Sequence, residues 1–526
     1  MEALKAMREA LLDWLRPRRK LLASFRSQWA APGNKDEPRA GRWFRLTRAD
    51  TLVVDDKTWA DLEFPRIFRE LDTTTTPLGS QVLHGQLRQC LDDAAVLAER
   101  HALHVRLRDD AALRERLQMI LVAMQDRQYA DVADAVFGDG IESSSQRTVL
   151  MAGAGAALLA LVGVACSLLS AWVFVAVLAV NVLVVYRNSA KVLRQAEALG
   201  CCVVMLQVAR KLSGCGFDNP LITQIRAQQP ARDTVQRGLR LLFAYRRCPP
   251  WLAIFLNFVF LLELILHALS IAHFQRTRQQ LHRTFELVGG LDAAIAAASA
   301  MAMFPRHCQP QLSDAPHLEM VDGMHPLLPR GVTNSIRLQR RSALVMGSNM
   351  AGKTTFVKML AVNAILGRTL GFCLASRAVL PRAQIMASIH GRHSVESGKS
   401  HYFAEVEAIR GFLASEQTAN GHLFVLDEPF SGTNTQERIA IAFAVLRALC
   451  RQSIVLVTTH DVELQALLEE HYELFHFQED PAVDGFFDYQ LRAGPARHKN
   501  AIRILARMGF PDDVVEAALA TSATLQ

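Results

Sequence analysis

A glycine-bounded loop between a short apolar stretch and the start of a helix carries the clearest chemical signal in the sequence. Residues 347–355 match the phosphate-binding pattern GxxxxGK[ST]. Backbone N–H groups of such a loop point at phosphate oxygens, while Lys353 would reach the β- and γ-phosphates and Thr354 would occupy one Mg²⁺ position. The pattern therefore predicts a P-loop, whose ATP-binding residues are Gly347, Ser348, Asn349, Met350, Ala351, Gly352, Lys353, Thr354 and Thr355.

Two carboxylates end a second apolar stretch, residues 422–426. A continuous apolar run of this length predicts a strand that is buried on both faces of a parallel sheet. Asp427 is expected to hold Mg²⁺ through water, as in a Walker B motif. Glu428, one residue on and aimed differently, is expected to orient and deprotonate the water that attacks the γ-phosphate.

A third predicted strand, residues 453–458, ends two residues before His460. Open α/β sheets bind ligands at the carboxyl ends of their strands, so His460 is placed to sense the γ-phosphate. Two simpler interpretations compete: His460 could merely cap the next helix, and Asp427 could be an ordinary loop acid. Three such strand ends in this order favour a catalytic site with Glu428 and His460.

The composition bounds the class of protein. With 526 residues, 50% of them hydrophobic, the chain is long enough for two to four domains and a large core. A net charge of +7 is compatible with nucleic acid, with an anionic membrane surface, or with a membrane protein that keeps Lys and Arg on its cytoplasmic side. The nine cysteines show no CxxC spacing, which indicates a reducing compartment and no metal site.

The first 50 residues are predicted to contain a basic amphipathic helix. Residues 1–48 hold 12 Lys or Arg against 5 Asp or Glu, with apolar residues at roughly helical spacing. This charge also argues against a cleavable signal peptide. The helix could lie on an anionic leaflet, contact nucleic acid, or pack on the next domain. Residues 51–147 then predict the first part of a helical core, with long helices running through Leu83, Leu91 and Leu121.

Residues 148–186 contain no charged side chain across 39 positions. One straight helix of that length would measure about 58 Å, roughly twice a ~30 Å hydrocarbon core, so two spans fit better than one. We predict a transmembrane hairpin that turns near residues 167–170. Arg147 precedes it and Arg187 follows it, which places both ends on the cytoplasmic side. A buried helix pair in a soluble core is the alternative.

A second apolar run, residues 251–274, is broken by Glu263 and His267. If the hairpin crosses twice, a lone extra crossing here would put the ATP site outside. The number of membrane crossings before the ATPase should therefore be even, which favours a buried helix, a membrane-surface helix or a short second hairpin for this run. The rival topology, one span in each run, would export residues 187–248, which hold 11 Lys or Arg against 3 acids. The positive-inside rule disfavours it, although weakly for a loop this long.

The remaining segments complete the predicted architecture. Residues 187–314 are expected to form the second part of the helical core and residues 315–526 the ATPase domain, with short strands around 318–328 and 332–338. The predicted fold class is α plus α/β: a helical core with an inserted transmembrane hairpin, followed by a P-loop α/β ATPase domain.

These motifs together resemble the MutS family of mismatch-repair ATPases over most of the chain. Residues 347–355 are similar to the family's GPNMGGKST loop, and residues 398–405 to its signature GRSTFMVE. The LSGGQ signature of transporter ATPases is absent. Further similar segments are residues 71–79, 324–328, 432–435, 459–460, 489–494, 500–502 and 509–511.

The resemblance carries expectations beyond the motifs. It implies ATP and Mg²⁺ as cofactors and a head-to-tail homodimer, in which Ser400 of one copy completes the ATP site of the other from a helix N-terminus. It also implies that Asn334 lies on the nucleotide side. Tyr489, near the last strand, is the position at which the family rests adenine against an aromatic or His side chain.

The departures from the family bear on function. A mismatch sensor begins with a mismatch-binding domain that carries a Phe-x-Glu wedge, and with a connector domain. Only about 50 residues precede the core here, and no Phe-x-Glu occurs in them, so mismatch recognition is unsupported. Smaller departures are Ala351 in place of a loop glycine and Pro429 after Glu428. The uncharged run stands where the family builds its lever and DNA-clamp helices.

Two functions from different classes follow. The first is a membrane-anchored ATPase in which ATP binding closes a dimer, Glu428 promotes hydrolysis, and the core helices relay the change to the hairpin. The second is a tethered DNA repair or recombination factor that binds duplexes non-specifically through its basic surface. A transporter subunit is disfavoured by the missing LSGGQ signature and by too few spans.

Overall fold

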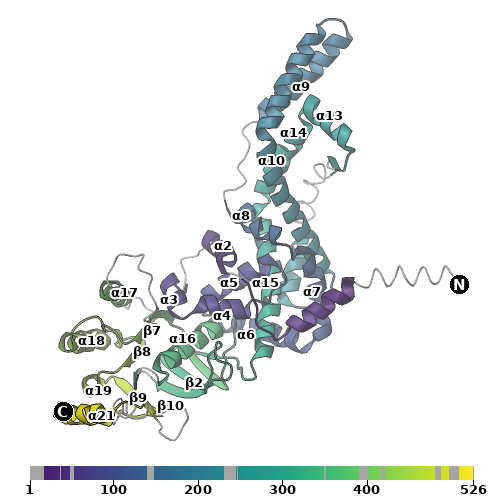
Figure 1. Cartoon of the computed structure of the whole chain (residues 1–526). Coiled ribbons are helices and arrows are strands. Elements are labelled where there is room, and N and C mark those ends of the chain that lie inside the picture. The colour runs from purple at the N-terminus through teal and green to yellow at the C-terminus, as the bar shows by residue number, and fades with distance from the viewer. Residues whose placement is uncertain are drawn as a thin grey trace, which may run out of the picture. The chain divides into compact units, whose positions relative to one another are not determined.

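The chain forms two compact units, which Figure 1 follows from the N-terminus to the C-terminus in a computed structural model. Unit one comprises Met1–Ala49, Arg69–Gly85 and Leu103–Met303, and unit two comprises Asp50–Phe68, Gln86–Ala102 and Phe304–Gln526. The structure describes residues 17–35, 37–47, 53–138, 147–229, 244–245, 247–339, 341–348, 351–389, 401–415, 421–479, 487–496 and 509–524.

Unit two is built on two β-sheets. The larger has the strand order β10-β9-β4-β8-β7-β6, and all its neighbouring strands are parallel except β9 and β10. Its central strands are buried at every position and mostly apolar, because both of their faces are covered. The larger sheet consists of β4 (Ser342–Met346), β6 (Gln384–Ser388), β7 (His422–Asp427), β8 (Ile454–Thr459), β9 (Tyr472–Glu479) and β10 (Phe487–Ala493). The smaller sheet, of order β1-β5-β2-β3, consists of β1 (Gln311–Ser313), β2 (His317–Gly323), β3 (Asn334–Gln339) and β5 (Arg377–Pro381).

Helix α16 (Lys353–Thr369) lies between these sheets and is buried along most of its length. It contacts β6, β7 and β8 of the larger sheet and β2 of the smaller one. Its one buried amide is satisfied: Asn363 donates to the Met324 carbonyl at 3.0 Å and accepts from the Leu374 N–H at 2.6 Å. Because α16 begins directly after residues 347–352, this burial anchors that loop.

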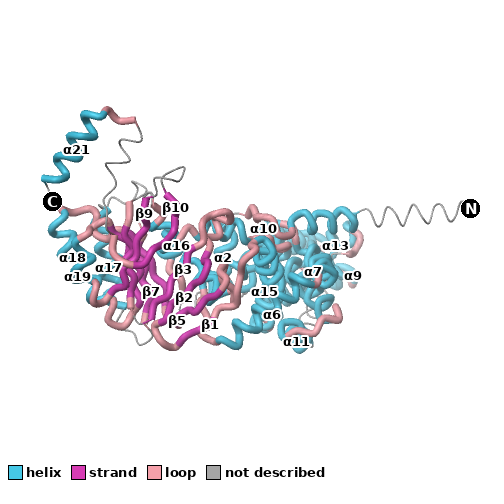
Figure 2. Tube along the Cα trace, turned by 90° about the horizontal axis from the view of Figure 1, so that it is seen from below, coloured by secondary structure: helices cyan, strands magenta, loops and turns pink. Residues whose placement is uncertain are grey.

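The helices that follow β6, β7 and β8 pack on the larger sheet and share one core. Phe412 of α17 (His401–Ser415) stacks on Phe424 of β7 with ring centroids 5.0 Å apart. Leu446 of α18 (Thr435–Leu449) and Leu464 of α19 (Glu463–Leu468) belong to the same apolar cluster. Figure 2 shows α17, α18 and α19 together beside the strands, and α21 (Asp512–Thr524) at the C-terminus.

Part of the segment predicted to be helical core belongs to unit two. Helix α3 (Asp56–Asp61) covers the edge strand β6: Thr58 accepts from the Ala387 N–H at 3.0 Å, and Asp61 from the Ile389 N–H at 2.9 Å. The expected continuous helix through Leu91 was wrong, because α5 (Pro77–Arg88) ends and α6 (Ala94–Asp109) begins on either side of it. The Leu91 N–H instead donates to the Arg368 carbonyl at 2.8 Å.

Unit one is helical and has an aromatic and polar core. Phe137, Trp43 and Phe285 are in ring contact, and the buried Asp292 accepts from the N–H groups of Thr75 and Thr76 at 2.9 and 2.7 Å. Its helices are α2 (Glu37–Thr47), α7 (Ala111–Leu121), η1 (Val122–Met124), η2 (Arg127–Asp131), α8 (Val132–Phe137), α9 (Arg147–Ala165), α10 (Ala171–Ser213), α11 (Pro220–Ala227), α13 (Pro250–Phe260), α14 (Leu262–Arg276) and α15 (Arg278–Met303). Helices α4 (Phe64–Leu71), α5 and α6 contribute residues to both units.

Helices α9 and α10 form a projecting hairpin in Figure 1. They are separated by residues 166–170, where the sequence predicts a turn; Ser167 there has φ 60° and Ser170 caps α10. Helix α10 is 43 residues long in all and extends to Ser213, well past the end of the apolar run at residue 186. Among the described residues, two helices are long and apolar enough to cross a membrane, Ala171–Ala190 and Arg278–Met303. Only 6% of the first is buried against 89% of the second, so α15 is a core helix and α10 presents its apolar side chains outward.

Candidate functional site

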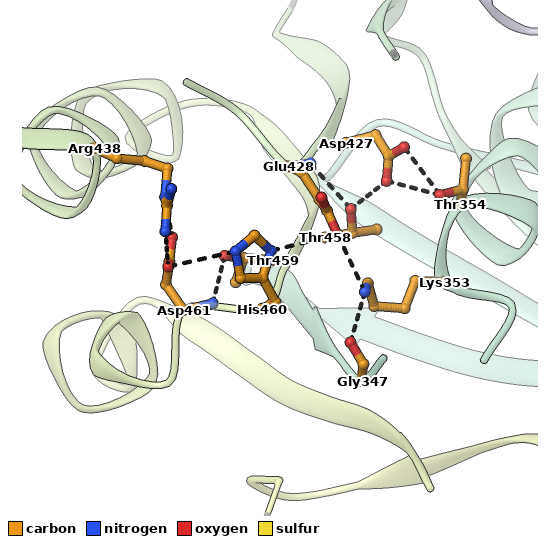
Figure 3. A network of polar contacts seen from close by, with 10 residues as sticks. All are labelled: Gly347, Lys353, Thr354, Asp427, Glu428, Arg438, Thr458, Thr459, His460 and Asp461. Carbon is orange, nitrogen blue, oxygen red and sulfur yellow. Dashed lines mark hydrogen bonds and ion pairs between the residues drawn. The ribbon is translucent and has the colours of Figure 1, made fainter. Parts of the chain in front are cut away.

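Three neighbouring strands bring the predicted catalytic residues to one edge of the larger sheet. Thr458 of β8 pairs with Val345 of β4 on one side and with Asp427 of β7 on the other. The loop after β4, the carboxylates after β7 and His460 after β8 therefore emerge together at the carboxyl edge, where such sheets bind ligands. Figure 3 shows their side chains converging.

A hydroxyl and a carboxylate meet at the start of α16. The Thr354 hydroxyl lies 3.0 Å from Oδ1 and 2.9 Å from Oδ2 of Asp427. Thr458 donates its own hydroxyl to Asp427 and accepts from the Glu428 N–H at 3.2 Å, so it holds both acidic residues (Figure 3). Both groups at this point are hard oxygen donors, the type that Mg²⁺ prefers, and Thr354 and Asp427 therefore fit a magnesium ion.

Lys353 is a buried cation at the same point. Its side chain is 2% exposed, its Nζ donates to the Gly347 carbonyl at 2.6 Å, and it lies 3.3 Å from Oε1 of Glu428. Burial lowers the pKa of Lys353, while the charge of Glu428 raises it. A buried ammonium group needs anionic partners, so phosphate oxygens beside Lys353 would be favourable.

The loop from residue 347 to 352 requires glycine at both ends. Gly347 has φ 140°, and a Cβ there would lie 2.9 Å from the Phe477 carbonyl oxygen. Gly352 has φ 96° and immediately precedes the N-terminus of α16, the end of a helix that favours an anion. The buried hydroxyl oxygen of Ser348 has no hydrogen-bond partner among the described residues. This loop therefore has the properties of a phosphate cradle.

Glu428 is held in an uncommon backbone conformation next to His460. Its φ of 47° is rare for a non-glycine residue. Oε1 of Glu428 lies 3.5 Å from Nδ1 of His460. On the far side of the imidazole, Nε2 of His460 lies 3.9 Å from Oδ1 of Asp461. Arg438 of α18 donates two hydrogen bonds, of 2.8 and 2.6 Å, to the Asp461 carboxylate. A chain of polar contacts thus runs from Lys353 through Glu428, His460 and Asp461 to Arg438 (Figure 3).

Asn334 fixes the backbone of Tyr489 although the two lie 155 positions apart. The Asn334 side chain donates to the Tyr489 carbonyl at 2.9 Å and accepts from the Leu491 N–H at 2.7 Å. These bonds stabilise an irregularity of β10 in which Tyr489 has φ 55°. The half-exposed Tyr489 ring borders the loop, because a Cβ on Gly352 would lie 3.2 Å from its Cδ1.

The structure brings together the described members of the predicted site. Around the loop it assembles Gly347, Ser348, Ala351, Gly352, Lys353, Thr354, Asp427, Glu428, His460, Asn334 and Tyr489. Thr355 is exposed on the first turn of α16. Asn349, Met350 and Ser400 lie outside the described residues, as do the rest of residues 390–400, which include the first three positions of the predicted signature segment, residues 398–405.

Sequence reasoning gave no role to several residues that shape the site. Thr458, at the end of β8, contacts Asp427, and Asp461, two residues after β8, contacts His460. Glu405 of α17 accepts from the Phe430 N–H at 2.8 Å, which connects α17 to the turn after Glu428. Thr458 lies two positions before His460, on the predicted third strand. Knowing that this strand pairs with the strand of Asp427 would have been enough to place Thr458 beside that carboxylate. Nothing in the spacing indicates that Arg438 contacts Asp461.

Comparison with known proteins shows what the C-terminal part of the chain is similar to. Residues 343–526 match the family model described as MutS domain V, an α/β domain of the ATPase type. A DNA mismatch repair protein MutS of Thermus aquaticus is 31% identical over 252 residues, covering 47% of this chain and 30% of the relative. Similar proteins of the same name from Leuconostoc mesenteroides (30% over 254 residues) and Thermus thermophilus (29% over 252 residues) cover 45% and 47% of this chain. The matched part spans 29–30% of the length of each of these relatives.

Proposed function

The chain belongs to the MutS family through its C-terminal region, and we propose that it is a membrane-anchored ATPase that binds and hydrolyses Mg-ATP. The observation that carries the proposal is the meeting of Thr354 with Asp427 beside the Lys353–Glu428 pair. These four side chains supply, within one site, the metal ligands, the phosphate counter-charge and the base that phosphoryl transfer to water requires.

Each residue has one task in the proposed reaction. Thr354 and Asp427 would hold Mg²⁺, which when bound neutralises charge on the β- and γ-phosphates. Lys353, poised on the Gly347 carbonyl, exchanges that contact for phosphate oxygens. Glu428 takes a proton from the attacking water through its carboxylate. His460, 3.5 Å from Glu428, contacts the γ-phosphate and reports its presence to Asp461 and α18.

A second copy of the chain is proposed to complete the site. The resemblance to the family places Ser400, the residue that precedes α17 in the sequence, against the nucleotide of the partner, and Tyr489 against adenine. Glu405 supports this assignment, because its bond to the Phe430 N–H connects the helix that follows Ser400 to the turn after Glu428. ATP would then bind at a homodimer interface, and closure and hydrolysis would be coupled through α17.

Membrane anchoring is supported by the exposed apolar surface of the α9–α10 hairpin. Large side chains such as Leu159, Leu168 and Trp172 are between 72% and 80% exposed in a helical hairpin that has no charged residue over positions 148–186. Exposure on this scale is unfavourable in water and favourable in lipid. The hairpin is therefore proposed to span the bilayer, with both ends on the side of the ATPase.

The proposal is tested with the full-length protein in detergent and after reconstitution into liposomes. The protein should float with liposomes, remain in the membrane after alkaline carbonate washing, and hydrolyse ATP only with Mg²⁺. Lys353→Ala should float equally well but lose ATP binding and turnover. A wild-type protein that stays in the soluble fraction contradicts the anchor, and one that ignores Mg-ATP contradicts the ATPase.

A second candidate function is DNA association by a tethered repair or recombination factor. It is favoured by the name of the relatives, DNA mismatch repair protein, and by the net charge of +7. Binding to phosphates weakens steeply with salt. Duplex binding by the detergent-solubilised protein at low salt, lost at high salt and equal for matched and mismatched duplexes, would support this function. Absence of binding at low salt would leave the membrane role alone.

A further inference from the structure

Helices α13 and α14 meet at a sharp bend instead of forming one span. Their axes differ by 81°, and the connecting Leu261 has a left-handed φ of 51°. With 11 and 15 residues, the helices would measure about 16 and 22 Å, so neither crosses a ~30 Å hydrocarbon core. If the segment were a single span, the bend would have to be straightened.

The depth of this bend can be measured against the α9–α10 hairpin. A Cβ on Gly153 of α9 would lie 3.0 Å from the Leu261 side chain and 3.4 Å from Oδ1 of Asn181 of α10. Gly153 is six residues from Arg147, at the basic start of α9, and Asn181 is six residues from Arg187, at the end of the apolar run. At 1.5 Å per residue both helices place the bend about 9 Å inside the apolar segment.

Several polar groups at the bend find hydrogen-bond partners within unit one. A helix break frees backbone carbonyls, which are costly to leave unpaired in lipid. Here the buried Asn181 side chain donates to the Val259 carbonyl at 2.9 Å, and the Leu261 N–H donates to the Asn257 carbonyl at 2.9 Å. The Asn257 side chain donates to Glu263 at 3.1 Å. The hairpin therefore supplies the donor that the bend needs, and Asn181 has a reason to interrupt an otherwise apolar helix.

The two helices have one face on the hairpin and one face open. Leu261, Leu264 and Ala268 form a buried cluster with Leu150 of α9, against which Val184 and Val185 of α10 pack. The other face of α13 exposes Trp251, Ile254 and Phe255, whose relative exposures are between 53% and 71%. An apolar outer face on a short helix is suited to hydrocarbon on one side of a bilayer.

We propose that α13 and α14 form a re-entrant element that enters the leaflet next to the ATPase, turns at Leu261 about 9 Å deep, and leaves on the same side. The proposal deepens the proposed membrane anchor and rests on it. It identifies lipid acyl chains as the partner of Trp251, Ile254 and Phe255. Arg247, before α13, and Arg276, at the end of α14, then lie at the same membrane surface, as the positive-inside rule favours.

The position of this element also gives it a route into the helical core. Helix α14 is followed after Thr277 by α15, whose Asp292 holds the N–H groups of Thr75 and Thr76. A change in leaflet packing at α13 would therefore act on the segment that carries Asp292. This route lies entirely inside unit one.

Two native cysteines make the topology measurable. Cys166 lies in the turn between α9 and α10, and Cys248 lies just before α13. In liposomes with the ATPase outside, single-cysteine proteins carrying Cys166, Cys248 or an engineered Gln279→Cys after α14 are treated with a membrane-impermeant maleimide. The re-entrant arrangement predicts that Cys248 and Gln279→Cys react from outside, and that Cys166 reacts only after permeabilisation. The exposed Gln279 is chosen so that folding is preserved.

The alternative outcomes separate the two proposals. If Cys166 reacts only after permeabilisation but Cys248 and Gln279→Cys react on opposite sides, the segment crosses, and the re-entrant inference is overturned while the anchor stands. If Cys166 reacts from outside, the hairpin does not span and both proposals fail. Lipid contact is checked independently: brominated acyl chains should quench the fluorescence of Trp251, measured as the difference between Trp172→Phe and Trp172→Phe/Trp251→Phe. No quenching of that difference signal would overturn the lipid assignment.

Discussion

Nζ of Lys353 lies 3.3 Å from Oε1 of Glu428, so the cation that would bind phosphate and the carboxylate that would act as base are paired with each other before nucleotide arrives. The carboxylate favours the charged form of Lys353 against its burial. In the proposed reaction, entry of a phosphate group would offer Lys353 a second anion and release Glu428 toward water. The pair would then couple nucleotide binding to the availability of the base.

Replacing the base should separate binding from turnover. In Glu428→Gln, Lys353 keeps the phosphate as a partner but no group accepts the water proton, so we expect kcat to fall by about 100-fold or more with ATP affinity preserved. Single-turnover hydrolysis and binding of a fluorescent ATP analogue measure the two effects, with Lys353→Ala as the variant that loses both. Normal turnover by Glu428→Gln would remove Glu428 from the mechanism.

The metal site is tested by removing one oxygen at constant size. Thr354→Val deletes the hydroxyl that lies 2.9–3.0 Å from Asp427, whereas Thr354→Ser keeps it. We expect the valine variant to lose the Mg²⁺-dependent part of its ATP affinity by about tenfold or more, corresponding to about 1.4 kcal/mol, and the serine variant to resemble the wild type. Titration of Mg²⁺ at fixed ATP distinguishes them. Equal Mg²⁺ dependence in all three proteins would argue against Thr354 as a ligand.

Arg438 is expected to act on turnover through Asp461 and His460. Lysine cannot form the paired bonds of 2.8 and 2.6 Å that the guanidinium makes, so Arg438→Lys should loosen Asp461 and lower kcat by about 3- to 10-fold with little change in KM. In a His460→Ala background the same substitution should have no further effect, because the residue it positions is gone. Additive losses in the double variant would show that Arg438 acts elsewhere.

Close packing of α5 on α15 predicts opposite effects of alanine at two glycines. A Cβ at Gly79 would lie 2.3 Å from Oδ2 of the buried Asp292, whereas a Cβ at Gly200 in α10 meets nothing within 4 Å. Gly79→Ala should lower the free energy of unfolding by about 1–3 kcal/mol. Gly200→Ala should raise it by up to about 1 kcal/mol through helix propensity. Chemical denaturation in detergent compares the two; destabilisation of equal size would contradict the packing argument.

His325 gives unit two a stability that depends on pH. Burial lowers its pKa from 6.5 to about 4, and its neutral Nδ1 accepts from the Leu327 N–H at 3.2 Å. As pH falls from 6.5 toward 4, the unfolded chain takes up a proton that the folded chain does not. The free energy of unfolding therefore decreases over this window, by at most about 1.4 kcal/mol per pH unit. His325→Gln should show a shallower loss of thermal midpoint between pH 6.5 and 4.5; an unchanged slope would exclude His325 as its source.

The parts of the site that depend on local patterns could be predicted from the residues. The spacing of Gly347, Gly352 and Lys353 and the apolar runs before Asp427 and His460 each determine a strand or a loop over a few neighbouring residues. Strand β8 and the strands on either side of it lie where the runs predict them. The turn between α9 and α10 could also be predicted, since an uncharged run that is too long for one membrane span is expected to reverse direction.

Contacts between segments that are distant in the sequence could not be predicted. Asn334 and Tyr489 lie 155 positions apart, and neither the bend at Leu261 nor its partner Asn181 follows from hydropathy, which marks residues 251–274 as one run. Residues 53–68 were expected in the helical core, and the structure includes them in unit two, because Thr58 and Asp61 accept hydrogen bonds from the edge strand β6 and the residue after it.

By itself the sequence determined the glycine-bounded loop, the acidic strand ends and the uncharged hairpin, because backbone sterics and hydrophobic periodicity act over a few neighbouring residues. Only the tertiary structure decided which side chains complete them: Thr458 between the acids, Arg438 on Asp461, and Asn181 at the bend. These pairings depend on strand order and helix packing, which are set by the burial of the whole core and leave no periodic signal along the chain.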